Sequence, residues 1–167
     1  RVSNRDITPL KEAEQLAQKL AHFDPVTGLP NRRMLLDRLT PALASAKRHR
    51  RPLALMFIDL DKFKYVNDTY GHDIGDLLLV EVGQRLKNAV RASDTAARTG
   101  GDEFIVLLPE VASASDVDGV AGKILATIAM PIACQDLVLG VSASIGISLF
   151  DFTGPSDGTE LMKQADI

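Results

Sequence analysis

Apolar residues spaced three and four positions apart predict several amphipathic helices in this chain. Most of the intervening positions are polar or charged, as expected for helices that bury one face. The predicted helices span residues 9–23, 31–48, 75–91 and 113–130, and a further helix is expected to begin near Gly158. The segment 62–74 is polar and rich in turn-forming residues, so a loop is expected between the second and third helices.

Two further stretches carry the patterns of β-strands. A continuous apolar run at residues 53–58 predicts a central strand that is buried on both faces. The polar segment 59–61 is expected to end that strand. Between residues 141 and 149, apolar residues alternate with serine and glycine, which predicts a strand with one buried face.

A β-hairpin is predicted around two consecutive glycines, Gly100 and Gly101. Apolar residues at 95–98 and 104–109 flank this pair, and two strands joined by a tight glycine-containing connection form a hairpin. Glycine tolerates positive φ and leaves backbone that a phosphate or ribose can approach closely. Asp102 and Glu103 follow at once, so two carboxylates are expected at the hairpin tip.

The order of these elements predicts an α/β fold with a mixed, mainly antiparallel central sheet flanked by helices. Its βαββαβ core resembles the ferredoxin-like arrangement. In such a sheet Asp59, at the end of the central strand, can face the tip of the neighbouring hairpin.

Three carboxylates, those of Asp59, Asp102 and Glu103, would then surround one ion site. They repel one another unless a cation neutralises them. Mg²⁺ prefers carboxylate oxygens together with substrate phosphates, so the predicted chemistry is a metal–nucleotide site. The alternative is an ordinary solvated turn. Asp61 is either a further ligand or a structural residue, depending on whether the strand continues past residue 59.

Polar residues between the acidic positions suit a nucleotide. Asn67 and Asp76 carry groups that can hydrogen-bond to guanine, and Lys64 can neutralise a phosphate. His72 either contacts substrate or satisfies a local turn. For Asp76 the alternative is an N-cap at the start of the helix that follows.

Composition narrows the class of protein. At 167 residues, of which 46% are hydrophobic, the chain suits one globular domain with a real core. The net charge of −3 argues against a nucleic-acid partner. Cys134, the only cysteine, lies in an apolar run, which favours a buried inert thiol in a reducing compartment. No apolar run approaches the roughly 18 residues of a membrane span.

Several motifs, in the same order along the chain, resemble those of the GGDEF domain, the catalytic module of bacterial diguanylate cyclases. They are residues 24–33, 57–68, 70–76, 100–104 and 144–147. The resemblance covers almost the whole chain; Val26, where the family usually has Leu, is a minor departure at a packing position. The resemblance implies the nucleotidyl-cyclase palm fold. It also implies a reaction in which two GTP molecules condense to cyclic di-GMP and release two pyrophosphates.

The resemblance also implies the metal site and the groups that act in the reaction. The ion would be Mg²⁺, with Mn²⁺ as the alternative, and its ligands would be Asp59, the backbone carbonyl of Leu60, Asp102 and Glu103. Asp102 is also the candidate general base. Lys64 would stabilise charge on the transferring phosphoryl group.

For GTP itself, the resemblance implies a binding set that spans two segments of the chain. Asn67 and Asp76 would bind guanine, and His72 would position the substrate. Gly100 and Gly101 would admit the ribose and phosphates. Each domain would bind one GTP, so catalysis would need a homodimer.

A second nucleotide site is implied by Arg91 and Asp94. They match the Arg-x-x-Asp signature through which cyclic di-GMP inhibits its own synthesis in this family. A guanidinium suits a guanine edge or a phosphate, and a carboxylate suits the guanine N–H groups. The alternative is an arginine that ends a helix and an aspartate in the following turn.

The chain is expected to have two parts. Residues 1–23 would be a linker or signalling helix at the tail of an upstream sensor, because residues 5–11 resemble the junction after a PAS domain. The narrow apolar stripe of this helix suits pairing with its copy, or packing on its own domain. Residues 24–167 would be the GGDEF domain, truncated at its C-terminal helix.

Two alternatives to a simple cyclase remain open at the level of the sequence. One is a catalytically silent GGDEF module that binds GTP or cyclic di-GMP and regulates a neighbouring domain. The other is a bifunctional protein with a downstream phosphodiesterase domain. The expected location is the bacterial cytoplasm; the sequence leaves open whether the full-length protein is tethered to a membrane.

Overall fold

The computed structural model describes residues 4–152 and 162–163 of the chain. Its helices are α1 (Asn4–His22), α2 (Arg32–His49), α3 (Phe63–Tyr70), α4 (His72–Ala89) and α5 (Ala114–Ala129). Its strands are β1 (Leu53–Asp61), β2 (Thr95–Gly100), β3 (Glu103–Leu108), β4 (Ile132–Cys134), β5 (Leu137–Leu139) and β6 (Ser142–Phe150). The helix expected from Gly158 begins outside the described residues.

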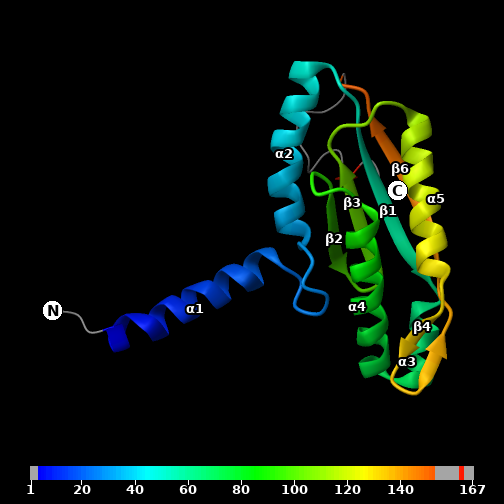
Figure 1. Cartoon of the computed structure of the whole chain (residues 1–167). Helices are drawn as coiled ribbons and strands as arrows, with labels where there is room; N and C mark the ends of the chain where they lie inside the picture. The colour runs from blue at the N-terminus through cyan, green and yellow to red at the C-terminus, as the bar shows by residue number, and fades with distance from the viewer. Residues whose placement is uncertain (1–3, 153–161, 164–167) are drawn as a thin grey trace.

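β1 is the central strand of a four-stranded antiparallel sheet, in the order β2-β3-β1-β6 (Figure 1). α3 and α4 connect β1 to β2, and α5 lies between β3 and β6, which is the predicted βαββαβ core. β4 and β5 form a separate two-stranded hairpin, which the sequence patterns did not resolve.

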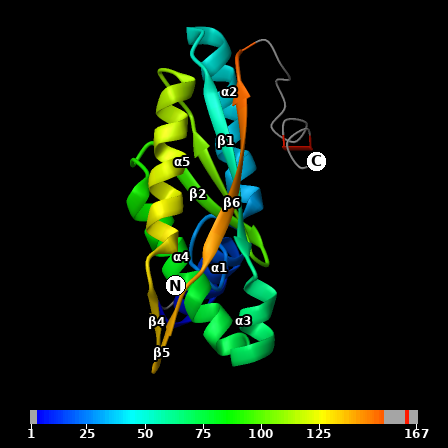
Figure 2. The ribbon, with the colours of Figure 1, turned by 90° about the vertical axis from the view of Figure 1, so that its right-hand side faces the viewer.

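Different helices cover the two faces of this sheet. α4 and α5 lie on one face and α2 lies on the other (Figures 1 and 2). Alternate residues of β1 contribute to two hydrophobic clusters, one on each face of the sheet, because successive side chains of a strand point to opposite faces. The cluster with α4 and α5 contains Ala54, Met56, Ile58 and Leu60, and the cluster with α2 contains Leu53 and Leu55. β1 is therefore buried on both faces, as predicted. α1 projects away from this body (Figure 1).

The structure corrects the sequence prediction around the end of β1. The strand does not end at residue 58 but continues to Asp61, because β6 pairs with it as far as Asp61 opposite Ser142. The expected loop that follows is mostly helix α3, which buries Phe63 and Val66. Gly71, with a φ of 92°, separates α3 from α4. α4 accordingly begins at residue 72 rather than 75.

The alternation predicted for the last strand holds only in part. Ala143 and Ile145 of β6 pack against the core beneath α4 and α5. Ile147 and Leu149 are 42% and 45% exposed. Among the strands that the structure describes, β6 has a neighbour on one side only, so its apolar residues are shielded less completely than those of an inner strand.

Cys134 is buried in β4, as predicted for an inert thiol. Burial, with a smaller contribution from Glu81, raises the pKa of the Cys134 thiol above its ordinary value. Within the part of the chain that the structure describes, no helix combines the length and apolarity needed to cross a bilayer.

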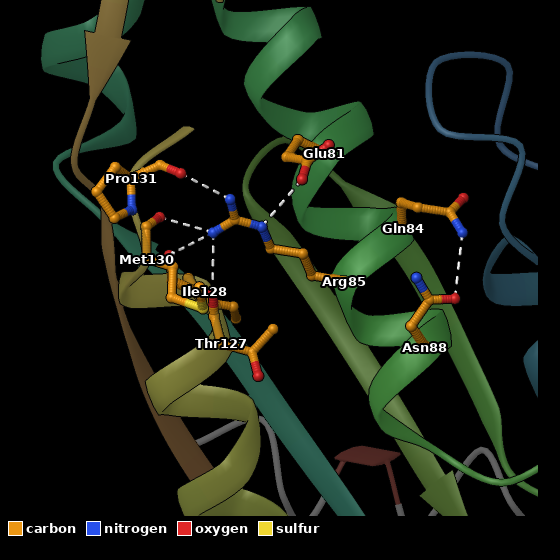
Figure 3. Close-up of polar contacts among 8 residues, drawn as sticks. All are labelled: Glu81, Gln84, Arg85, Asn88, Thr127, Ile128, Met130 and Pro131. Atoms are coloured by element: carbon orange, nitrogen blue, oxygen red, sulfur yellow. Dashed lines mark hydrogen bonds and ion pairs between the residues drawn. The ribbon is translucent and has the colours of Figure 1, made fainter. Parts of the chain in front are cut away.

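The side chain of Arg85 joins α4 to the end of α5 (Figure 3). Its guanidinium donates hydrogen bonds to the carbonyl oxygens of Thr127 at 2.9 Å, Met130 at 2.7 Å and Pro131 at 2.8 Å. Its Nε donates to Glu81 at 3.0 Å. The last carbonyls of a helix lack partners within the helix and favour a cation, so Arg85 stabilises the end of α5.

We expect Arg85→Met to lower the free energy of unfolding by about 2–3 kcal/mol, because several charge-assisted hydrogen bonds are lost at once. Urea denaturation measures the effect. Gln84→Ala is the matched control, since Gln84 is an exposed neighbour on α4 that pairs with Asn88 at 3.2 Å (Figure 3). It should change stability by less than about 0.5 kcal/mol. Equal losses in the two variants would contradict the capping role.

Candidate active site

Asp59 near the end of β1 and Glu103 at the start of β3 are direct cross-strand partners. Opposite residues of an antiparallel pair point to the same face with Cβ atoms about 5 Å apart. Both residues are exposed. The structure thus confirms that Asp59 faces the hairpin tip, and it brings two carboxylates together at one end of the sheet.

Asp102 occupies the turn of this hairpin and is tied to β1 through its backbone. The amide of Leu60 donates to the carbonyl oxygen of Asp102 at 3.2 Å. Among the described residues, no group of three or more histidine, cysteine, aspartate or glutamate side chains is arranged to hold a metal. The convergence of three carboxylates is therefore not seen. Of the predicted carboxylates, the structure brings Asp59 and Glu103 directly opposite each other.

Asp61 lies on the same face as Asp59, because the strand continues through both residues. Its carboxylate accepts hydrogen bonds from the hydroxyl groups of Ser142 at 2.7 Å and Ser144 at 2.8 Å. These two hydroxyls hold the pKa of Asp61 below its ordinary value. Of the two alternatives for Asp61, the structural role fits these contacts, because its carboxylate joins β6 to the end of β1 through hydrogen bonds.

This arrangement predicts a pH-dependent stability. Since the folded pKa of Asp61 is lowered, its stabilising effect is present above the ordinary aspartate pKa of 3.8 and is lost as the pH falls through the folded pKa. We expect wild type to be more stable than Asp61→Asn at pH 6, and the difference to shrink below about pH 4. Urea titrations measure it. Asp68→Asn, at an exposed position of α3, is the control; a constant difference for Asp61→Asn would contradict the assignment.

Helices α3 and α4 carry the residues predicted to bind the base. Asn67 lies on α3 against Gly75 of α4, so closely that a Cβ at position 75 would collide with its Oδ1 atom. Asp76 follows on α4 and is exposed, as is His72 at the first position of that helix. The N-cap alternative for Asp76 is wrong, because α4 begins at residue 72 with Gly71 as its cap.

The end of β1, the hairpin turn, α3 and the start of α4 lie at the same end of the molecule (Figure 1). Lys64, on α3, is exposed at this end. The predicted metal-binding and base-binding residues are therefore grouped at one end, although they come from four separate segments.

The two glycines of the hairpin leave space at the turn. Gly100 has a φ of 150° and Gly101 a φ of 50°, and a Cβ at either position would meet no atom within 4 Å. Backbone conformation, rather than packing, therefore requires glycine at Gly101. That Gly100 and Gly101 admit a ribose and phosphates stays a prediction.

Three residues near this site were not singled out from the sequence. Arg32 and Thr99 line a small hollow of about 40 Å³ beside Asp59 and Glu103. The Thr99 hydroxyl is buried and has no hydrogen-bond partner among the described residues. The third is Arg98, described below. Arg32 lies in one of the motifs noted above, but only the fold brings it to this face.

Arg91 and Asp94 lie between α4 and β2, at the opposite end of β2 from the glycine turn. The Asp94 side chain is only 3% exposed and accepts a hydrogen bond from the amide of Arg91 at 2.8 Å. Asp94 therefore closes a turn. The Arg91 side chain is 67% exposed and borders a hollow of about 520 Å³, which Lys123 also lines.

Residues 21–167 match the family described as "Diguanylate cyclase, GGDEF domain". MucR from Pseudomonas aeruginosa, a bifunctional diguanylate cyclase/cyclic di-GMP phosphodiesterase, is 46% identical over 95% of this chain and 23% of its own length. The diguanylate cyclase TpbB from the same species is 45% identical over 78% of this chain and 30% of its own length. The chain thus spans less than a third of these relatives.

Solved structures agree with this match. The GGDEF domain of TpbB superposes with a TM-score of 0.82 at 42% identity, covering 87% of this chain and 84% of that domain. DgcB from Caulobacter crescentus, in complex with cyclic di-GMP, gives a TM-score of 0.83 at 25% identity, covering 97% and 85%. With the fold, the glycine turn and the motif order in agreement, this chain belongs to the GGDEF family of diguanylate cyclase domains.

Proposed function

We propose that this chain is an active diguanylate cyclase, which condenses two GTP molecules to cyclic di-GMP and two pyrophosphates. The observation that carries the proposal is the Asp59–Glu103 pair, directly opposite across β1 and β3 beside the open glycine turn. Adjacent exposed carboxylates favour a divalent cation, so Mg²⁺ or Mn²⁺ fits the donor set. Bound there with the Leu60 carbonyl, such an ion would supply Lewis-acid stabilisation of charge on the phosphoryl group.

The residues of the chain would divide the remaining work. The 3′-hydroxyl of one GTP attacks the α-phosphate of the other, the bond to pyrophosphate breaks, and Asp102 accepts the proton of the hydroxyl. Lys64 would offset charge on the transferring group. The nearby backbone of Gly100 and Gly101 would let the ribose and phosphates approach closely.

Guanine recognition would rest on α3 and α4. The Asn67 amide and the Asp76 carboxylate would hydrogen-bond to the base, and His72 would position the nucleotide. The close packing of Asn67 on Gly75 supports this assignment, since it holds the amide of α3 against the first turns of α4, where Asp76 is the next residue after Gly75.

Two copies of the chain would act together, each holding one GTP. α1 supports such pairing: Leu10, Leu16 and Leu20 are 62%, 58% and 58% exposed on a helix that projects from the domain (Figure 1). Leucines exposed along one helix are suited to pack against a second copy. Residues 1–23 would then be a signalling helix that connects residues 24–167 to an upstream PAS-type sensor.

Product inhibition would use the hollow beside Arg91. Its exposed guanidinium and the neighbouring Lys123 could hold the phosphates or guanines of cyclic di-GMP. Asp94 would act mainly by closing the turn that carries Arg91. The substrate GTP is cytoplasmic, so we place the domain on the cytoplasmic side of a bacterial cell. A downstream phosphodiesterase domain would be in line with MucR, a bifunctional diguanylate cyclase/cyclic di-GMP phosphodiesterase of which the chain spans 23%.

The test is incubation of the chain with GTP and Mg²⁺, followed by chromatography of the products. We expect cyclic di-GMP and pyrophosphate from wild type, and none after chelation of the metal or in Asp102→Ala. GTP binding without turnover by wild type would instead support the silent-module alternative.

A further inference from the structure

Arg98 of β2 joins the hairpin tip to the turn after α1. Its Nη1 donates to Oδ1 of Asp24 at 2.8 Å, and the two side chains are 11% and 10% exposed. Its Nε and Nη2 both donate to the carbonyl oxygen of Gly101, at 3.0 Å and 2.8 Å. One nearly buried guanidinium therefore holds two segments that are far apart in the sequence.

Asp24 is itself fixed on the other side. Its Oδ2 accepts hydrogen bonds from both the amide and the hydroxyl of Thr27, each at 2.8 Å. The backbone of Asp24 is paired with Leu29 at 2.7 Å and with Gly28 at 2.8 Å. The turn that begins directly after α1 is thus an ordered anchor for Arg98.

The hairpin tip is held at two successive carbonyl groups. Arg98 binds that of Gly101, and the amide of Leu60 binds that of Asp102. Gly101 is in the left-handed region with a φ of 50°, and its carbonyl group belongs to the peptide bond that leads into Asp102 and then Glu103. A change at this carbonyl would turn the two following carboxylates.

We infer that Arg98 is a positioning residue, which uses Asp24 as its anchor to hold the carboxylates of the hairpin tip in the geometry that the reaction needs. This inference rests on the proposed cyclase function. It also gives a physical connection between the end of α1 and the candidate active site, through one side chain.

The alternative is an ion pair that stabilises the fold and does nothing for the tip. Arg85 of α4 provides the matched comparison, because its guanidinium also binds backbone carbonyls, but those carbonyls belong to the end of α5 and the residues after it rather than to the hairpin tip (Figure 3). If both arginines only stabilise the fold, substituting Arg98 or Arg85 should have the same kind of effect on stability and on activity. Only the positioning role predicts a local effect at the tip.

The experiment compares Arg98→Lys and Arg85→Lys in the intact chain. Lysine keeps the charge, but one ammonium cannot reproduce the planar fork of arginine. For Arg98→Lys we expect amide hydrogen exchange at residues 100–103 to rise at least tenfold, and kcat to fall at least tenfold with a small change in KM for GTP. Arg85→Lys should lower Tm with neither effect. Asp24→Asn serves as a second variant and should reproduce the Arg98→Lys result.

Unchanged exchange at 100–103 in both Arg98→Lys and Asp24→Asn would overturn the inference, as would faster exchange with an unchanged kcat. Failure of the proposed function gives a different result. In that case wild type makes no cyclic di-GMP, while the exchange comparison still decides whether Arg98 holds the tip.

Discussion

Asp59→Asn should reduce cyclic di-GMP synthesis by at least about 10²-fold, the size of effect that follows loss of one preorganised electrostatic group. Asp59 supplies one of the two carboxylates that lie opposite each other at the ends of β1 and β3. Removing its charge leaves only one of the two negative charges of this pair to attract a divalent cation. Initial rates of pyrophosphate release at several Mg²⁺ concentrations measure the effect, and Glu103→Gln should behave in the same way.

Asp61→Asn is the matched control for this prediction. Asp61 is on the same strand and the same face, but its carboxylate is occupied by Ser142 and Ser144. We expect this variant to retain activity within a few-fold. The rise in Tm that Mg²⁺ and GTP together produce should disappear in Asp59→Asn and persist in Asp61→Asn. The reverse pattern would move the ion site from Asp59 to Asp61.

Local patterns were enough to predict most elements of this fold. The long helices α2, α4 and α5 bury one face each, and their spacing of apolar residues is readable without a structure. The hairpin was equally clear, because Gly100 and Gly101 separate two apolar runs. From these elements alone, Asp59 could be expected beside the hairpin tip.

The missed features depend on contacts between distant segments. β1 reaches Asp61 only because β6 pairs with it there, about eighty residues later in the chain. The sequence predicts a loop in place of α3, because this helix is short and buries only Phe63 and Val66. Arg98 and Asp24 are 74 residues apart in the sequence, so no local pattern could predict their ion pair. For the same reason, the hydrogen bond from the Leu60 amide to the Asp102 carbonyl could not be predicted from local sequence.

The second large effect is expected from a single methyl group at the interface of α3 and α4. In Gly75→Ala the new Cβ would collide with Oδ1 of Asn67, so the amide must move away from its place against Gly75. If Asn67 binds guanine, KM for GTP should rise about tenfold or more, because the base loses a hydrogen-bonding partner. Steady-state kinetics with GTP measure the change.

Gly119→Ala is the matched control, since Gly119 is also a helical glycine but has open space around its Cβ position. That substitution should leave KM unchanged and raise stability slightly, as alanine favours helix. The decisive comparison is Gly75→Ala in an Asn67→Ala background. If the methyl acts through the Asn67 amide, Gly75→Ala should raise KM little further once Asn67→Ala is present, because both substitutions remove the same interaction. Additive losses would show instead that the methyl disturbs the packing of α3 on α4, and the assignment of Asn67 to the base would lose its structural support.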